Sequence, residues 1–418
     1  MGYSGVSQDN IANVEILNAK LRKESWYNTF WSKFSGFVDI SKDDNGNKLK
    51  RPSGNPIEIL KEFEQGRDNM LLPLQKDLTG DPVYGDTVVA GTGNSLDYNW
   101  LRIYVNQYRK AAVPQKGRMS RQRIKFLQRY RNTLPALKKW VSKWENQSVM
   151  QAFYEGISPN LSAGTDDDGL GLAKRYHPNW YINDGGTLTT IGSENTLKTN
   201  AQLDAALIDA GTCDDCIDMA ILRDLRVKCM ELMIPQMETK EGHKFWVLIL
   251  HPDQVNNLKK DSTFQSAINS AYQKKIISHP QFSGAIAVVE GFAIYEDLIM
   301  IRSWDDADAS FFGSTWAERM ANSSGAVKNA LVLGNQAMGK GIAEPMGTTL
   351  EKSDHDNVIE MATYAIDGYN RADFFDEDDA LESSGDAFYK NQSSGHVAAE
   401  LSAYNRSSLI FSTDTAGD

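Results

Sequence analysis

The spacing of hydrophobic positions changes several times along the chain, and each change predicts a different element. Residues 13–37 carry apolar and aromatic side chains at spacings of three and four, which predicts a helical arm. Six aromatic residues lie within its last twelve positions, more than a short terminal helix can bury against its own chain. We therefore expect this arm to dock on a neighbouring molecule. Its candidate contact residues are Trp26, Phe30, Trp31 and Phe34.

Residues 70–114 show a different pattern, that of two strands joined by a glycine-rich tip. Leu101, Ile103 and Val105 alternate with polar or aromatic neighbours, a period of two that is typical of a strand with two different faces. An isolated hairpin is only marginally stable in water, so we expect this one to pack against something else. Its candidate contact residues are Trp100, Tyr104 and Tyr108.

A long amphipathic helix is predicted after Ser120, which is a suitable N-cap. Apolar residues recur every three or four positions to about Tyr154, and Pro135 is expected to kink or divide the helix. Residues 102–143 contain thirteen Lys or Arg and no Asp or Glu, although the net charge of the chain is −11. This asymmetry favours association with copies of the chain or with nucleic acid over a merely solvated helix face. The basic candidates are Arg118, Arg121, Arg123, Lys125, Arg129 and Arg131.

The second half of the chain alternates between helical and strand patterns, which predicts an α+β fold. Residues 156–199 are rich in Gly, Asp and Asn and predict a long irregular insertion. A compact domain is expected to follow. Its helices are expected at 201–209, 214–233, 254–260 and 263–272, and its strands at 244–250, 285–290, 292–296 and 298–301. Strands at 330–333 and 359–366 then precede an acidic segment and a polar tail.

Composition excludes several classes of protein. With 418 residues, 41% of them hydrophobic, the chain is globular and long enough for two or three cores. No apolar stretch approaches the roughly 20 residues of a membrane helix, so we expect no membrane partner. No secretory signal is visible, and three cysteines are too few for a disulfide framework. Both observations favour synthesis inside a cell, in a reducing compartment.

No motif provides a convincing catalytic, cofactor or metal site. The segment Gly334–Lys340 has the glycine and lysine spacing of a phosphate-binding loop, but the next residue is Gly341, where a Ser or Thr must ligate magnesium. A nucleotide-binding enzyme is therefore the weaker alternative, and Lys340 is expected to be a surface charge. Cys213 and Cys216 have the spacing of half a zinc site, without a second pair. We expect no enzyme activity and no cofactor.

The order of elements, namely aromatic arm, glycine-tipped hairpin, long basic helix, α+β domain and late strands, resembles the major capsid proteins of tailed bacteriophages, which have the Hong Kong 97-type fold. The resemblance covers about residues 23–150 and 240–370. The stretches that carry it are Lys23–Trp26, Phe34–Gly36, Pro56–Ile57, Leu71–Leu74, Leu78–Asp81, Gly85–Asp86, Gln107–Arg109, Gly117–Met119, Gln122–Arg123, His251–Asp253, Gly291–Phe292, Leu331–Gly334, Gln336–Ala337 and Ala365–Gly368.

The resemblance implies a division of the chain into the parts of such a subunit. These are an N-terminal arm (1–50), a peripheral-domain segment (51–69), an extended loop formed by the hairpin (70–114), the spine helix of the peripheral domain (115–155), the irregular insertion (156–199), an axial domain (200–328), peripheral-domain strands (329–372) and an acidic C-terminal segment (373–418).

The function implied by the resemblance is self-assembly into an icosahedral head shell that encloses double-stranded DNA. The implied partners are copies of the chain, as hexamers and pentamers, together with scaffolding, portal and decoration proteins and packaged DNA. The implied location is the virion, after assembly in the cytoplasm of a bacterial host. An encapsulin-like shell around protein cargo is the alternative within this class. A protein that binds DNA through the basic helix alone is a further alternative.

Overall fold

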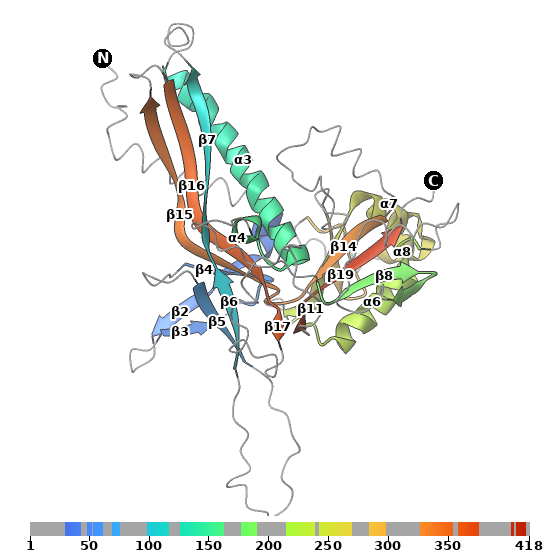
Figure 1. Cartoon of the computed structure of the whole chain (residues 1–418). Helices are drawn as coiled ribbons and strands as arrows, with labels where there is room; N and C mark the ends of the chain where they lie inside the picture. Colours follow the sequence, from blue (N-terminus) through green and yellow to red (C-terminus); the bar gives the residue numbers. More distant parts are fainter. Residues whose placement is uncertain are drawn as a thin grey trace, which may run out of the picture.

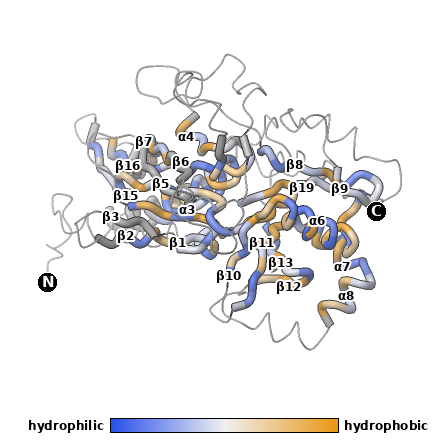
Figure 2. Tube along the Cα trace, turned by 90° about the horizontal axis from the view of Figure 1, so that it is seen from below, coloured by the Kyte–Doolittle hydropathy of each residue, from blue (hydrophilic) through white to orange (hydrophobic). Residues whose placement is uncertain are grey.

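Two β-sheets with helices packed on them form the framework of the computed structural model (Figure 1). The part of the molecule that contains the eight-stranded sheet lies beside the part that contains the five-stranded sheet and α3 (Figure 1). The view from below shows the same separation (Figure 2). The structure describes residues 30–42, 48–51, 53–61, 69–75, 98–116, 126–162, 177–189, 215–238, 242–269, 284–297, 327–353, 358–375, 403–404 and 407–414.

The first sheet is built from segments that are far apart in sequence. Its five strands, in spatial order, are β1 (Ser35–Phe37), β4 (Ile57–Leu60), β15 (Met338–Ser353), β16 (Val358–Arg371) and β7 (Asn106–Lys116). The long strand β16 lies between β15 and β7 and runs antiparallel to both, whereas β1, β4 and β15 run parallel. Helix α3 (Phe126–Glu155) lies along β7 and β16 (Figure 1).

The second sheet has eight strands, with β11 (Lys244–Leu250) near its centre. Strand β11 is buried on both faces, as its unbroken apolar run predicts. The other strands are β8 (Trp180–Asp184), β9 (Thr187–Thr189), β10 (Met237–Glu238), β12 (Ala287–Val289), β13 (Phe292–Glu296), β14 (Val327–Leu333) and β19 (Ser408–Asp414).

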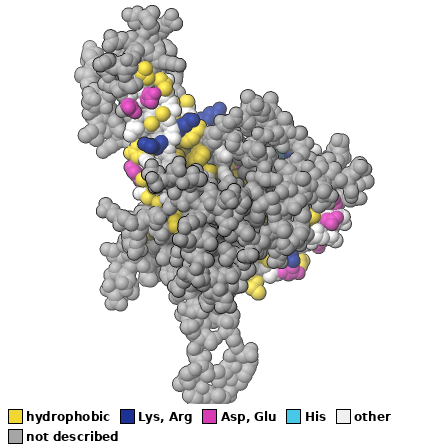
Figure 3. Space-filling view, in the orientation of Figure 1, with side chains coloured by type: hydrophobic (Ala, Val, Ile, Leu, Met, Phe, Trp, Pro, Cys, Tyr) yellow, Lys and Arg dark blue, Asp and Glu magenta, His cyan; other side chains and the backbone are white. Residues whose placement is uncertain are grey.

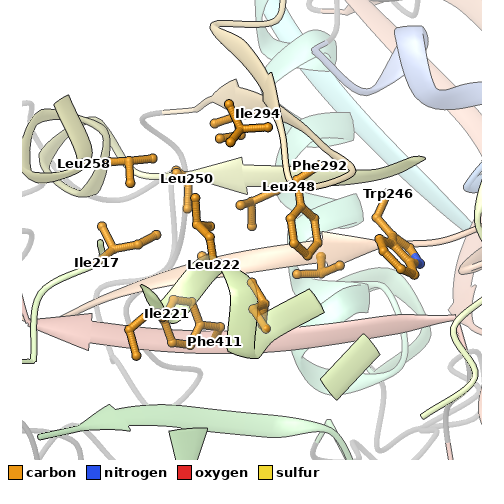
Figure 4. Close-up of a cluster of buried hydrophobic side chains, with 14 of the residues drawn as sticks. Ile217, Ile221, Leu222, Trp246, Leu248, Leu250, Leu258, Phe292, Ile294 and Phe411 are labelled. Carbon is orange, nitrogen blue, oxygen red and sulfur yellow. The ribbon is translucent and has the colours of Figure 1, made fainter. Parts of the chain in front are cut away.

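Alternate residues of β11 enter two different cores. Trp246, Leu248 and Leu250 pack with the helices α6 (Met219–Glu231), α7 (Pro252–Lys260) and α8 (Ser262–Asn269). Figure 4 shows Leu250 near Leu222 of α6 and Leu258 of α7. Phe245, Val247 and Ile249 point the other way, into a cluster that also contains residues of α3 and of the first sheet. Because successive side chains of β11 point to opposite faces, this strand contributes to a local core on one face and, on the other, to the core shared by both sheets.

Local sequence signals explain where the helices of the second half begin. The carboxylate of Asp218 caps α6 by accepting a hydrogen bond from the Ile221 amide (2.8 Å). Helix α7 has Pro252 at its first turn and a reciprocal cap, in which the His251 ring accepts from the Asp253 amide and the Gln254 side chain accepts from the His251 amide.

Six shorter elements also belong to the described part of the chain. Strands β2 (Asp39–Lys42) and β3 (Lys48–Arg51) pair with each other, as do β17 (Phe374–Phe375) and β18 (Ala403–Tyr404). The 3-10 turn η1 (Phe30–Phe34) precedes β1, and the short helix α4 (Pro159–Ser162) follows α3. No helix among the described residues is long and apolar enough to cross a membrane.

The strands and helices expected between residues 214 and 296 are confirmed in type, with small shifts of their ends. The expected elements at 201–209 and 298–301 lie outside the described residues. The predicted hairpin is also found, because β5 (Asn69–Gln75) pairs antiparallel with β6 (Tyr98–Tyr104). It is shorter than expected at its base, since β7 leaves it after Val105 and joins the first sheet.

Three segments differ from the sequence predictions because strands pair over long distances. Residues 156–199 are not wholly irregular, since β8 and β9 lie in the second sheet. Residues 327–333 belong to that sheet as β14, and not with β16. The C-terminal segment is not only an acidic tail, since β19 is buried along its whole length between β14 and β8.

Two predictions about helices are wrong. Pro135 does not divide the long helix, because α3 continues through it from residue 126 to residue 155. Pro135 and the residue after it are exposed. The arm helix was expected to reach residue 37, but Ser35–Phe37 form β1, which pairs with β4. The preceding residues of that prediction, before 30, and the cap Ser120 lie outside the described residues.

The base of the hairpin crosses the first sheet closely at two glycines. A Cβ atom added at Gly368 on β16 would lie 2.2 Å from the backbone oxygen of Tyr104, whereas one at Gly339 on β15 would lie 2.3 Å from Cδ1 and 2.8 Å from Cγ1 of Ile103, a side chain that can shift. We predict that Gly368→Ala lowers the free energy of unfolding by about 1–3 kcal/mol or more, and that Gly339→Ala costs less. Urea unfolding of both variants measures the difference. Equal stabilities would show that the crossing is not a fixed contact.

Candidate functional site

The extended hairpin is anchored at its base to the first sheet. Leu101 and Ile103 of β6 are buried with Leu60 and Ala372. The Tyr104 amide donates a hydrogen bond to the Asn370 side chain on β16 (3.0 Å). From this fixed base the two strands extend away from both sheets (Figure 1). The glycine-rich tip, residues 76–97, lies outside the described residues.

A pair of asparagines fixes the point where β6 gives way to β7. The Asn160 side-chain amide on α4 donates to the backbone oxygens of Asn106 (3.1 Å) and Asp367 (2.7 Å), and the Asn106 side-chain amide donates to the backbone oxygen of Asn160 (2.8 Å). These bonds satisfy backbone groups of two strands at the bend. They explain why one sequence pattern, which predicts a single long return strand, divides into two.

The structure buries most of the aromatic interface candidates inside their own chain. Trp31 and Phe34 are 0% and 3% exposed, and both belong to the cluster that joins the two sheets. Tyr104 and Tyr108 are also buried, in clusters next to α4 and α3 respectively. The expectation that these four side chains need a neighbouring molecule to complete their burial is therefore wrong.

The remaining aromatic candidates have different outcomes. Phe30 is partly exposed and packs edge-on against Trp31, with ring centroids 5.4 Å apart. Trp100 lies on β6 opposite Pro73, but its side chain is outside the described part of the structure, as is the whole of Trp26. For these residues, contact with a neighbouring molecule stays a prediction.

The described part of the basic region is a surface formed by β7 and α3. Arg109, Lys110 and Lys139 are exposed, and the rings of Trp140 and Trp144 stack beside them with centroids 5.8 Å apart. Lys110 Nζ lies 5.8 Å from the centroid of the Trp140 ring. Figure 3 shows hydrophobic and charged side chains side by side on the upper part of the molecule.

The predicted basic candidates lie at the beginning of this region. Arg129 and Arg131 are in the first turns of α3, with side chains outside the described set. Arg118, Arg121, Arg123 and Lys125 precede the helix and are not described.

The segment that resembles a phosphate-binding loop has the wrong geometry for one. Gly334 follows β14, and after a turn the chain enters β15 at Met338, whereas a phosphate loop leads into a helix. Lys340 is not a surface charge as expected: it is 3% exposed, and its Nζ donates to Glu145 Oε2 on α3 at 2.9 Å. A buried, paired lysine is unavailable to a nucleotide phosphate.

This ion pair belongs to a larger cluster that the sequence did not predict. The Tyr108 hydroxyl on β7 lies 3.5 Å from Asp367 Oδ2 on β16. Burial, followed by the charge of Glu145, raises the pKa of Asp367 to about 8, although Lys340 opposes the shift. One signal was present in the sequence: Glu145 follows Val141 by four residues on the apolar stripe of the helix, where a charge is unexpected.

A second buried charge joins the end of α3 to β16. Arg371 is 0% exposed and pairs with both carboxylate oxygens of Asp373 at 2.7 Å. Its guanidinium also donates to the carbonyls of Phe153 (2.5 Å) and Tyr154 (3.3 Å), in the last turn of α3. Burial, followed by the charge of Arg371, lowers the pKa of the nearby His177 well below its ordinary value, so this imidazole stays neutral.

The outer face of α6 carries exposed apolar side chains. Val227, Met230 and Met233 are 54%, 51% and 72% exposed, the last with a positive φ of 54° just after the helix. Arg223 and Arg226 on the same helix pair with Glu290 at 3.3 and 3.1 Å. An apolar strip bordered by charges is typical of a surface that contacts another protein.

The cysteines are not all free thiols. Cys216 is disulfide-bonded, although three cysteines are too few for a disulfide framework. Cys229 is free and buried in α6. Within the described ranges, no group of three or more His, Cys, Asp or Glu side chains is placed to hold a metal ion.

Comparison with known proteins identifies the class to which this arrangement belongs. The family model described as phage capsid protein matches residues 29–387, and the chain therefore belongs to the phage capsid protein family. Its members are structural proteins of the virion, and the Hong Kong 97-type capsid fold expected from the sequence is confirmed. None of the curated proteins matches the sequence.

Solved phage capsids share the fold at low sequence identity. The capsid of Ralstonia phage GP4 has a TM-score of 0.60 and 16% identity, with 92% of this chain and 91% of that chain covered. The capsid of cyanophage Pam1 has a TM-score of 0.54 and 16% identity, with coverages of 91% and 97%. The acid-stable capsid of Helicobacter pylori bacteriophage KHP30 has a TM-score of 0.53 and 11% identity, with coverages of 99% and 99%.

Proposed function

We propose that this chain is the major capsid subunit of a tailed bacteriophage and that its copies, arranged as hexamers and pentamers, tile an icosahedral shell around double-stranded DNA. The observation that carries the proposal is the family match over residues 29–387, together with capsid folds that align over more than nine tenths of both chains. Capsid subunits of this family build the head shell, so the role we assign to the chain is assembly.

The hairpin is the first element that we assign to contacts between subunits. Its base is fixed to the first sheet by Leu101, Ile103 and the Tyr104 amide, so the strands extend from a rigid support. A projecting two-stranded ribbon buries little of its own surface and gains stability when it lies across another molecule. In a shell of identical subunits, that molecule is the adjacent copy.

The α6 face and the basic surface are two further contact regions in this proposal. The strip of Val227, Met230 and Met233 is apolar enough to be covered by a neighbouring subunit. The surface with Arg109, Lys110 and Lys139 has the charge to face either packaged DNA or the acidic remainder of another copy. Scaffolding, portal and decoration proteins are the further partners that such a shell requires, and assembly would take place in the host cytoplasm.

A protein-cargo shell of the encapsulin type is the second candidate, because the same subunit design can close around protein. The nucleic-acid content of purified particles distinguishes the two. The nucleotide-enzyme alternative is not carried further, because Lys340 is buried against Glu145.

We predict that the purified chain, alone or with a scaffolding protein, forms closed particles of megadalton mass. Electron microscopy and sedimentation of the recombinant protein measure this directly. A strictly monomeric species under both conditions would contradict the capsid proposal. Particles purified from an infected host that contain protein but no nucleic acid would favour the cargo shell.

A second prediction separates folding from assembly at the hairpin tip. Replacing residues 80–94 with a short Gly-Ser turn should leave the melting temperature of the unassembled subunit near its native value, because the tip is too polar and glycine-rich to build a core. Assembly should fail or give malformed shells, because the clasp on the neighbour is shortened.

The matched control for this variant is Gly368→Ala, which disturbs the hairpin base and should lower the melting temperature. Thermal unfolding and particle yield by microscopy are measured for both proteins. Normal shells from the tip variant would show that the loop is dispensable, and a strongly lowered melting temperature would place it in the monomer core.

A further inference from the structure

Four ionisable side chains from four different elements meet between α3 and the first sheet. They are Glu145 on α3, Lys340 on β15, Asp367 on β16 and Tyr108 on β7. Lys340 Nζ donates to Glu145 Oε2 at 2.9 Å, and both side chains are nearly inaccessible, at 4% and 5% exposed. The Tyr108 hydroxyl lies 3.5 Å from Asp367 Oδ2, and both of these residues are also buried.

The formal charges of this cluster do not balance. Among the described side chains, it holds one ammonium group and two carboxyl groups, and the ammonium donates to Glu145. Lys340 Nζ also lies 4.8 Å from the centroid of the Tyr369 ring, which adds an aromatic face and no charge. If both carboxyls were ionised, one net negative charge would be buried between helix and sheet, at a high cost in desolvation. A proton on the second carboxyl removes that charge.

We propose that the cluster is a proton-binding site, that the proton resides on the Asp367 carboxyl of the folded subunit, and that its release loosens the packing of α3 on strands β7, β15 and β16. The proposal concerns the single subunit and holds whether or not the chain builds a shell. Like charges that share a site commonly divide one proton between them in this way.

The titration behaviour of the groups in contact supports the assignment. Burial and the Glu145 charge raise the pKa of Asp367 from 3.8 to about 8. Burial raises the pKa of Tyr108 well above 10, so the phenol keeps its proton throughout this range. Between about pH 4 and pH 8 the folded chain therefore holds a proton that the unfolded chain has lost. The stabilisation from this group is complete below pH 4, falls as the pH rises, and is lost above about 8.

The first test compares the pH dependence of stability in two isosteric variants. Asp367→Asn keeps the shape of the protonated acid and cannot ionise, whereas Asp224→Asn on α6 removes an exposed carboxylate and serves as the control. Urea unfolding is measured from pH 6.5 to pH 9. One proton changes the folding equilibrium constant by at most about tenfold per pH unit. As the pH rises to about 8, the free energy of unfolding of the wild type and of Asp224→Asn should fall relative to that of Asp367→Asn. Above about pH 8 the three curves of free energy against pH should run parallel.

Two more substitutions separate proton binding from simple packing. In Glu145→Gln, Lys340 can pair with Asp367, which should then ionise, so the pH dependence should disappear as in Asp367→Asn. In Lys340→Met, Asp367 loses the cation that opposes its protonation, so the loss of stability with rising pH should continue above pH 8. Curves that are displaced in stability but parallel to the wild type in all three variants would contradict the proposal.

A direct observation of the proton does not depend on any variant's stability. The infrared spectrum of the folded subunit should contain the carbonyl band of a protonated carboxylic acid at pH 7, and this band should vanish as the pH passes about 8. Hydrogen exchange of the α3 amides around Glu145, corrected for its intrinsic pH dependence, should accelerate over the same interval relative to β11. Absence of the band at pH 7, or unchanged protection of α3, would overturn the proposal.

Discussion

The buried guanidinium of Arg371 joins the end of α3 to the end of β16, beside Phe153 and Tyr154 of the core that both sheets share. The guanidinium donates hydrogen bonds to two carbonyls in the last turn of α3 and to both carboxylate oxygens of Asp373. The helix end, the end of β16 and the residues after it therefore meet at one side chain. A cation at a helix C-terminus is favoured by the helix dipole, and a bidentate pair restricts its geometry. The Arg371 amide also donates to the Gly156 oxygen (2.9 Å), which fixes the turn out of the helix.

Around this charge, one hydrophobic cluster is shared between both sheets. Phe153 and Tyr154 of α3 pack with Trp180 of β8, and with β11 and β14 residues from the second sheet, while Ile57 and Tyr369 come from the first. A subunit that must hold its shape while its surface is covered by neighbours benefits from such continuity, because force on one sheet is transmitted to the other. The projecting hairpin, the α6 strip and the basic surface are then carried by one rigid frame.

Sequence patterns predicted the elements whose signals are local. The apolar run of β11 fell where expected, and α7 begins two residues before the expected residue 254, because burial of a strand and periodicity of a helix are visible in consecutive residues. Strand β19 was missed because its partner β14 lies some eighty residues earlier, and a short strand followed by a polar end has no periodicity of its own. The family resemblance, in contrast, rests on stretches spread over most of the chain.

The candidate site was predicted less well for the same reason. Trp31 and Phe34 were expected at a subunit interface because nothing near them in sequence can cover them, yet Phe153 and Tyr295 do so from far along the chain. Lys340 was expected at the surface because its partner Glu145 is 195 residues away. Burial of an individual side chain is a property of tertiary packing, which local spacing does not contain.

The most direct test of this account is hydrogen exchange of the unassembled subunit, in the wild type and in Arg371→Met. In the wild type, the slowest amides of β16 and β11 should exchange with the same free energy, because the shared cluster makes the two sheets open together. In the variant, Asp373 is left buried without its partner, so the free energies of both strands should fall together by about 3–5 kcal/mol. Independent opening of the two sheets in the wild type, or a loss confined to one strand in the variant, would contradict the claim that a single core unites them.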